Sequence, residues 1–147
     1  MKGYWKDPAR TQQALRGGWL HTGDLGRMDQ DGFVYLMCRM GEELRDGTAW
    51  HFARQIEEAL YEHPAVEHAA AIVFFDAQRR TRLKAYASLF DPASGVTERE
   101  LLEFLTARLP AAVCPSTVEI VADMPRTGSG KLNRSALRAR EEAAAEI

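Results

Sequence analysis

The sequence is poor in cysteine and lacks a long apolar segment, and each absence excludes a class of protein. Its 147 residues include only Cys38 and Cys114, too few for a disulfide framework or a cysteine-based zinc site. No apolar run approaches the roughly 20 residues of a membrane-spanning helix, and the first residues lack the apolar core of a secretory signal. We therefore expect reduced thiols, no membrane span and a cytoplasmic location.

The sequence also lacks an excess of positive charge. Nineteen Lys and Arg residues stand against 21 Asp and Glu residues, and the net charge is -2. This balance argues against a general nucleic-acid-binding protein, which usually carries a basic excess. Basic residues cluster at 79–84 and 134–140, and we expect both clusters to be solvated faces.

The pattern from about residue 40 onward predicts an α+β domain. A polar, glycine-punctuated loop over 38–51 is expected first, and the Glu-Ala-rich C-terminal tail is expected to fray. Between them we expect helices over 53–62, from Thr97 to Leu109 and from about 134, and strands over 66–75, 83–90 and 118–121. The apolar run 66–75 suits a buried central strand. This order predicts a small sheet with packed helices.

The sequence pattern of residues 1–38 predicts fewer helices and strands than the pattern after residue 40. A short helix is expected after Asp7-Pro8, followed by strands over 19–28 and 32–37 with a turn at 29–32. A lone hairpin is marginal in water, so aromatic residues such as Trp5 and Trp19 imply packing on something else. We predict a domain boundary after residue 38, with domains 1–38 and 39–147.

A lysine ends the segment Pro-Arg-Thr-Gly-Ser-Gly-Lys at 125–131. A positive charge on a glycine-rich loop suits contact with a phosphate or carboxylate. The segment is not a P-loop, because that pattern needs Gly five residues before its Gly-Lys pair and Ser or Thr after the lysine. Pro125 and Leu132 occupy those positions. Taken alone, the segment fits a solvated turn with a surface lysine.

The longer string 124–134, Met-Pro-Arg-Thr-Gly-Ser-Gly-Lys-Leu-Asn-Arg, resembles the final motif of the adenylate-forming superfamily, which includes acyl-CoA synthetases, luciferases and adenylation domains of peptide synthetases. The resemblance implies that Lys131 bridges the substrate carboxylate and the ATP phosphate during acyl-adenylate formation. A placed ammonium stabilises the charge that develops there, and the glycines let the loop enter and leave.

A second segment, Trp-Leu-His-Thr-Gly-Asp at 19–24, is similar to another motif of the superfamily. The resemblance implies that Asp24 accepts hydrogen bonds from the ribose hydroxyls of the nucleotide; alone, it would pass for a turn aspartate. The family's Asp-Arg-Lys-type sequence corresponds to Cys38-Arg39-Met40. Arg39 is carried over as a residue near the ribose, and Cys38 stands at the hinge position in place of the aspartate.

Residues 45–53 depart from the family's glycine-rich loop, which lines the thioester-forming site. Only Gly47 and the aromatic Phe52 match, while Trp50 and His51 are bulky where the family is small and polar. We expect His51 to be packed or exposed rather than catalytic. The following segment, 57–66, returns to the family pattern, so the fold is expected to be kept while the thioester-forming surface is altered.

The resemblance extends from residue 3 to about 138 and implies that 40–141 form the C-terminal lid domain of an acyl-CoA synthetase-like ligase. Such a lid rotates between an adenylating and a thioester-forming pose. The full reaction would consume ATP and a carboxylic acid, release pyrophosphate and AMP, and load CoA or a carrier thiol. The phosphate loop, the acyl pocket and the Mg²⁺ ligand belong to the N-terminal portion, so we expect no metal site in this chain and no catalysis by it alone.

Two alternatives stay open. The altered hinge and loop would suit a stand-alone, non-catalytic protein that binds a nucleotide, CoA or a partner. The aromatic residues of 1–38 would suit one chain of a split ligase, completed by a separate N-terminal chain, or self-association.

Overall fold

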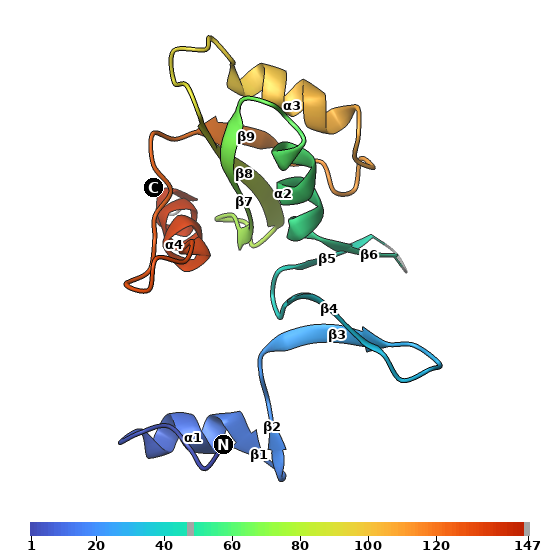
Figure 1. The fold of residues 1–147 in the computed structure, drawn as a ribbon, viewed down its shortest axis with the longest axis vertical. Helices are drawn as coiled ribbons and strands as arrows, with labels where there is room; N and C mark the ends of the chain where they lie inside the picture. The colour runs from blue at the N-terminus through green and yellow to red at the C-terminus, as the bar shows by residue number, and fades with distance from the viewer. Residues whose placement is uncertain (47–48, 146–147) are drawn as a thin grey trace. The chain divides into compact units, whose positions relative to one another are not determined.

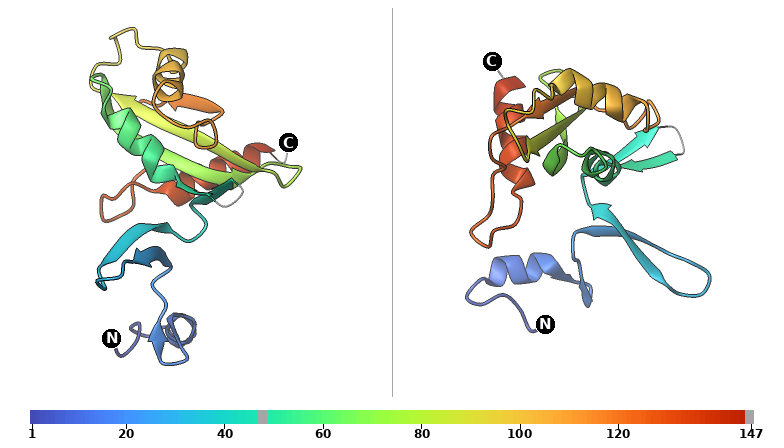
Figure 2. Two further views of the ribbon diagram at one scale, coloured as in Figure 1. Left: turned by 90° about the vertical axis from the view of Figure 1, so that its right-hand side faces the viewer. Right: turned by 45° about the horizontal axis from the view of Figure 1, so that its top comes forward.

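A computed structural model of the chain describes residues 1–46 and 49–145. The chain divides into two compact units, 1–40 and 41–147, called here the first and second units, and the views of Figures 1 and 2 show the elements of each. The elements are α1 (Pro8–Ala14), β1 (Leu15–Arg16), β2 (Trp19–Leu20), β3 (Asp24–Met28), β4 (Val34–Arg39), β5 (Glu43–Asp46), β6 (Ala49–Phe52), α2 (Ala53–Tyr61), β7 (Val66–Phe75), β8 (Thr81–Leu89), α3 (Glu98–Thr106), β9 (Thr117–Ile120) and α4 (Arg134–Ala145).

The first unit begins with the predicted short helix, which is confirmed. The Asp7 carboxylate accepts a hydrogen bond from the Arg10 amide at 2.9 Å, and a proline stands in the first turn. The predicted strand over 19–28 is wrong in its first part. Trp19–Leu20 pairs back with Leu15–Arg16, because Gly17 and Gly18 adopt positive φ angles of 58° and 80° and close a tight turn.

The predicted hairpin of the first unit is confirmed as β3 and β4, which pair antiparallel. Asp29 organises the turn, because one carboxylate oxygen accepts hydrogen bonds from the amides of Asp31 and Phe33 at 3.1 and 2.9 Å. The Tyr35 hydroxyl donates to its other oxygen at 2.8 Å. The hydrogen bond from Tyr35 holds the pKa of Asp29 below its ordinary value, so the turn keeps its acceptor ionised.

The second unit is built on a three-stranded sheet in the order β7-β8-β9, with β7 antiparallel and β9 parallel to β8. The predicted strand at Val66–Phe75 is confirmed, but its predicted central position is wrong, since β8 lies in the middle. A continuous apolar run indicates that both faces of a strand are covered. It does not indicate whether the strand has a neighbouring strand on one side or on both.

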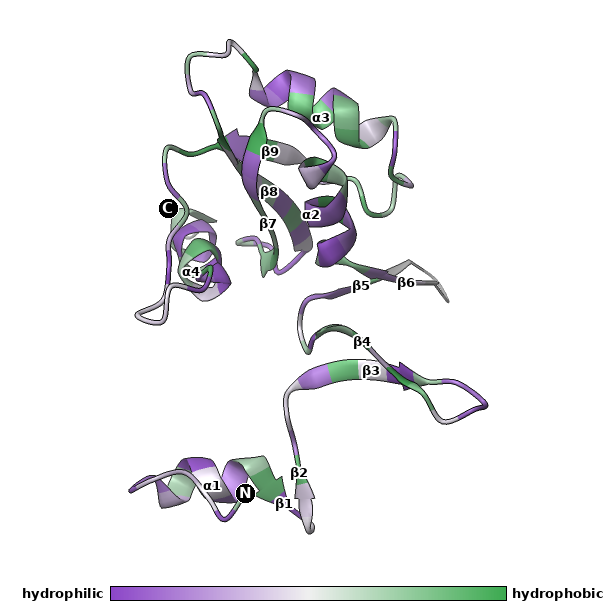
Figure 3. Ribbon diagram, in the orientation of Figure 1, coloured by the Kyte–Doolittle hydropathy of each residue, from purple (hydrophilic) through white to green (hydrophobic). Residues whose placement is uncertain are grey.

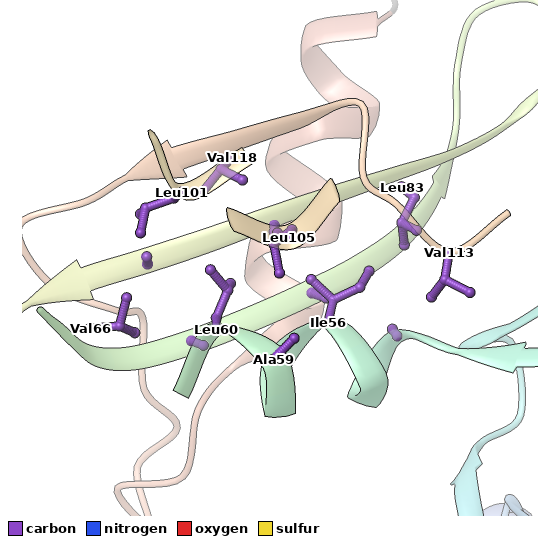
Figure 4. Packing of buried hydrophobic residues seen from close by; sticks show 14 of the residues in the cluster. Ile56, Ala59, Leu60, Val66, Leu83, Leu101, Leu105, Val113 and Val118 are labelled. Carbon is purple, nitrogen blue, oxygen red and sulfur yellow. The ribbon is translucent and has the colours of Figure 1, made fainter. Parts of the chain in front are cut away.

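Helices pack on both faces of this sheet, and the predicted small sheet with packed helices is confirmed. On one face, Ile56 and Leu60 of α2 meet Leu101 and Leu105 of α3, all fully buried (Figure 4). Each such side chain contributes roughly 1.5–3 kcal/mol on burial. Figure 3 shows polar and apolar residues alternating along α3 and α4, as expected for helices with one buried face.

The opposite face of the sheet carries a smaller apolar cluster. Ala70 and Ile72 of β7 and Tyr86 of β8 pack with Met124 and with Leu137 of α4. Met124 and Leu137 flank the segment that contains the Gly-Ser-Gly-Lys loop. Both sides of this loop are therefore tied to the sheet by buried side chains.

Four further predictions were wrong in part. Residues 43–46 and 49–52 form a hairpin rather than a loop, and α4 runs to Ala145 instead of fraying. The third helix ends at Thr106, before Leu109. The basic clusters are not merely solvated, because Lys84 lies between Glu119 and Glu141 at 2.8 and 2.9 Å, with its side chain 17% exposed. Long-range ion pairs leave no periodic signal in a sequence.

Candidate functional site

Asp24 and Arg39 lie opposite each other in the β3–β4 ladder. Their side chains form an ion pair, with 2.8 Å between Arg39 Nη1 and Asp24 Oδ1. The same Nη1 donates to the carbonyl oxygen of Thr22 at 2.7 Å, and the Thr22 hydroxyl accepts from the Asp24 amide at 3.1 Å. The strand pairing thus brings together two residues that are 15 positions apart in the sequence.

Gly23 shapes the turn that carries this pair. Its φ of 77° is in the left-handed region, where glycine is favoured. A Cβ built there would lie 3.6 Å from Arg39 Nη1, and the Gly23 carbonyl accepts from the Met40 amide at 2.9 Å. The Thr-Gly-Asp turn therefore wraps the Arg39 guanidinium and fixes the direction of the Asp24 carboxylate.

Asp24 also lines an open pocket of about 510 Å³ within the first unit, together with Arg10, Arg16, His21 and Thr22. Its side chain is 32% exposed, and its Oδ2 accepts no hydrogen bond from residues 1–46 or 49–145. Asp24 Oδ2 can therefore accept hydrogen bonds from hydroxyl groups of a ligand, while Arg10 and Arg16 attract an anion. This combination of an acceptor and two cations fits a sugar phosphate.

Cys38 lies inside β4 and pairs with Leu25. The boundary between the two units falls between Met40 and Gly41, two residues beyond the predicted hinge position. Gly41 has a φ of 87°, which lies in the left-handed region. The backbone at Gly41 is thus in a conformation that favours glycine.

The Lys131 loop is a closed turn in the second unit. The Thr127 amide donates to the Lys131 carbonyl at 2.7 Å, and the Gly130 amide donates to the Thr127 carbonyl at 2.8 Å. Gly130 takes a φ of 80°, and Arg126 bridges Leu132 across the base of the turn. The Lys131 side chain is exposed and forms no ion pair within the described part of the chain. The turn therefore presents an ammonium to solvent.

A partly buried ion pair anchors the end of this loop. Arg134, three residues after Lys131, donates from Nε and Nη2 to the two carboxylate oxygens of Glu57 at 2.9 and 2.6 Å. Glu57 is 8% exposed and also accepts from the Ala71 amide at 2.9 Å. Sequence reasoning missed this role of Glu57. A signal existed, because a glutamate next to Ile56 on the apolar face of a helix needs a buried partner.

A second anchor holds the other end of α4. Glu141 accepts from Lys84 Nζ at 2.9 Å and from the Tyr86 hydroxyl at 2.6 Å, and Arg140 pairs with Glu119 at 2.6 Å. Burial, with the hydrogen bond to Glu141, raises the pKa of Tyr86 to about 12. The helix after the lysine loop is thus fixed to Glu57 of α2 at its start and to the sheet near its end.

The altered segment 45–53 forms part of the β5–β6 hairpin. His51 pairs with Leu44 and is partly buried, whereas Trp50 is 44% exposed. Leu44 and Trp50 line an open pocket of about 760 Å³ with Cys114 and other residues of the second unit. Gly47, which the sequence comparison singled out, lies outside the described residues. The segment carries the exposed aromatic Trp50 at the position that corresponds by resemblance to the family's glycine-rich loop.

Over 1–46 and 49–145, His, Cys, Asp and Glu form no group of three or more that could hold a metal ion. In the same part of the chain, no helix is long and apolar enough to cross a membrane.

A small α+β domain that carries an exposed lysine on a closed turn is consistent with the adenylate-forming class, and comparisons with known proteins identify its family. The family model described as "AMP-binding enzyme C-terminal domain" matches residues 55–131. The long-chain-fatty-acid–CoA ligase of Bacillus subtilis (strain 168) is 39% identical over 93% of this chain and 24% of its own length. The chain therefore belongs to the AMP-binding enzyme C-terminal domain family, and it spans about a quarter of the length of such curated relatives.

Solved structures agree with this assignment. The anthranilate CoA ligase AuaEII in complex with anthranoyl-AMP matches 99% of this chain and 28% of its own, with a TM-score of 0.80 and 31% identity. ATP-bound MatB from Rhodopseudomonas palustris matches 98% of this chain and 29% of its own, with a TM-score of 0.79 and 27% identity. The similarity covers nearly all of this chain and corresponds to the C-terminal part of the relatives.

Proposed function

We propose that this chain forms the C-terminal part of an acyl-CoA synthetase-like ligase, which activates a carboxylic acid with ATP and then transfers the acyl group to CoA or a carrier thiol. The observation that carries the proposal is Lys131, an exposed ammonium presented by a closed turn that is anchored through Arg134. The relatives of this chain are acyl-CoA ligases, and this similarity supports the same reaction here.

Each proposed site residue has a distinct role. The Asp24 carboxylate accepts hydrogen bonds from the ribose hydroxyls of ATP or AMP, and Arg39 holds that carboxylate in place. Lys131 stabilises the negative charge that develops on the phosphate when the acid attacks. Asp24 and Arg39 belong to the first unit and Lys131 to the second, so we propose that a domain movement gathers them, with the pivot near Cys38 to Gly41.

The partner of this chain, in our proposal, is the large N-terminal domain, either in the same polypeptide or as a separate chain. That domain would supply the acyl pocket and the Mg²⁺ ligand. The exposed aromatic residues of the first unit, such as Trp5 and Trp19, support an interface there. The sequence has only two cysteines, Cys38 and Cys114, and this scarcity suits a reducing compartment, so we place the protein in the cytoplasm.

The test is acid-dependent exchange of pyrophosphate into ATP. The chain would replace the matching portion of the Bacillus subtilis ligase, and a long-chain fatty acid would be the substrate. We expect exchange by this chimera, none by the isolated chain, and a loss of about 10²–10³-fold in Lys131→Ala. The matched control is Lys6→Ala, another exposed lysine, which should leave the rate unchanged. Equal rates in Lys131→Ala and the parent chimera would contradict the proposal.

A further inference from the structure

A second contact connects the lysine loop to the sheet, and the proposed function does not account for it. The Nε2 atom of His68, on β7, lies 2.8 Å from Nη2 of Arg126. Nη1 of the same arginine donates to the carbonyl oxygen of Gly130 at 3.2 Å. One guanidinium thus joins a strand of the sheet to the residue that immediately precedes Lys131.

The chemistry of the two side chains fixes the direction of this contact. A guanidinium can only donate hydrogen bonds, so Nε2 of His68 accepts and the ring proton lies on Nδ1. The ring is therefore neutral while the contact exists. Ser88 lies opposite His68 in the β7–β8 ladder; it is 3% exposed, and its hydroxyl has no hydrogen-bond partner within the described chain. Nothing described across the strands competes with Arg126 for Nε2.

We propose that His68 is a positioning residue, which sets the pose of the Lys131 loop by holding Arg126 against Gly130. Its catalytic consequence rests on the proposed role of Lys131. Arg126 stands at the entrance of the loop and Arg134 follows its exit, so the two contacts hold the loop 127–131 from both ends.

The two contacts differ in strength, and this difference assigns them different tasks. Arg134 binds both carboxylate oxygens of the buried Glu57, a charge-assisted bidentate pair. Arg126 is exposed and bonds to one neutral nitrogen, which gives a weaker hydrogen bond. The Arg134 contact therefore fixes the start of α4. The weaker contact between His68 and Arg126, called here the latch, is the one that can break and re-form.

Amide hydrogen exchange in the full chain tests the latch without reference to catalysis. The reporters are the amides of Thr127 and Gly130, which donate within the turn. His68→Leu removes the acceptor and should speed their exchange about fivefold to tenfold. His68→Gln and His68→Glu each offer an oxygen to Arg126 and should restore slow exchange. Unchanged exchange in His68→Leu, or equal rates in the Leu and Gln variants, would overturn the proposal.

Two controls keep this comparison decisive. The Ala71 amide, bonded to Glu57, reports whether the second unit is intact and should stay protected in every variant. If His68→Leu does not fold, Arg126→Gln replaces it, because that change breaks the same latch from the loop side. Fast exchange of the Thr127 and Gly130 amides in Arg126→Gln, together with slow exchange in His68→Gln, would support the latch. Slow exchange of these amides in both variants would overturn it.

Pyrophosphate exchange by the chimera tests the catalytic consequence. His68→Leu should lower kcat about fivefold with little change in KM for the acid, and His68→Gln should rescue it. Adding His68→Leu to Lys131→Ala should cause no further loss, because the latch acts through the lysine. If Lys131→Ala retained full activity, the proposed function would fail, and the amide result would still decide whether His68 positions the loop.

Discussion

The two units of this chain treat their apolar residues in opposite ways. In the first unit, Trp5, Trp19 and Val34 are 88%, 77% and 74% exposed, and none of residues 1–40 is buried. In the second unit, Ile56 and Leu105 are completely buried, within a core that joins two helices to a sheet. One region contains its own core, whereas the other carries apolar side chains that require another surface.

Chain length explains part of this difference. A segment of about 40 residues buries too little surface to fold alone without disulfides, metals or partners, and isolated hairpins are marginal in water. The first unit contains a seven-residue helix and two separate two-stranded sheets. The local order of such elements depends on what they pack against.

Separating the two units should give the largest effect. We expect residues 41–147 to unfold cooperatively on heating, because their core lies within that segment. Residues 1–40 should show no cooperative transition. Circular dichroism of the two pieces, followed through a thermal scan, is the measurement. A sharp transition in the shorter piece would break the comparison.

Removing the carboxylate of Glu57 should destabilise the second unit by about 3–4 kcal/mol, since Arg134 and the Ala71 amide would lose their buried acceptor. Urea unfolding of Glu57→Ala measures the change. The matched control is Glu58→Ala, which breaks only an exposed pair with Arg54 and should cost less than about 0.5 kcal/mol. Similar costs for the two variants would count against a buried anchor.

One leucine in each unit sharpens the comparison further. Leu105→Ala should cost about 3 kcal/mol, because it leaves a cavity in the core. Leu20→Ala, in the first unit, should cost less than about 0.5 kcal/mol, since that side chain is 49% exposed. Both values come from urea denaturation of the full chain. A large cost at Leu20 would mean that the first unit has a core of its own.

Alkaline pH should weaken the second unit modestly through Tyr86. Its pKa is raised from 10.0 to about 12 in the fold, so the stabilisation is fully present below pH 10 and is lost as the pH rises toward 12. Tyr86→Phe should cost about 1 kcal/mol at pH 8 and flatten the decline above pH 10. Stability curves of both proteins from pH 8 to 12 test this. An unchanged decline would assign the effect to another group.

Local patterns made much of the second unit predictable. Thr97 caps α3 through its hydroxyl, as the sequence indicated, and the apolar run of β7 matches its predicted bounds. The central position of β8 and the ion pair between Glu57 and Arg134 depend on residues far apart in the chain, whereas the β5–β6 hairpin is local and its polar composition concealed it. The place of β8 in the sheet therefore left no local signal, whereas the signal for Glu57 was its position beside Ile56 on the apolar face of α2.

The candidate site divides in the same way. The motifs around Lys131 and Asp24 were visible in the sequence, and the roles proposed for these residues rest on a family resemblance. The pairing of Asp24 with Arg39 comes from the strand register. The latch between His68 and Arg126 spans 58 positions, and neither residue is distinctive by itself. Only the fold could bring these two side chains together.

The most direct test of the central claim separates the two half-reactions of the Lys131→Ala chimera. Adenylate formation would be followed by pyrophosphate exchange, and thioester formation would be started from supplied acyl-adenylate and CoA. The account predicts a loss of about 10²–10³-fold in the first half-reaction and a nearly unchanged second half-reaction. Equal losses in both, or a loss only in the second, would contradict the role given to Lys131.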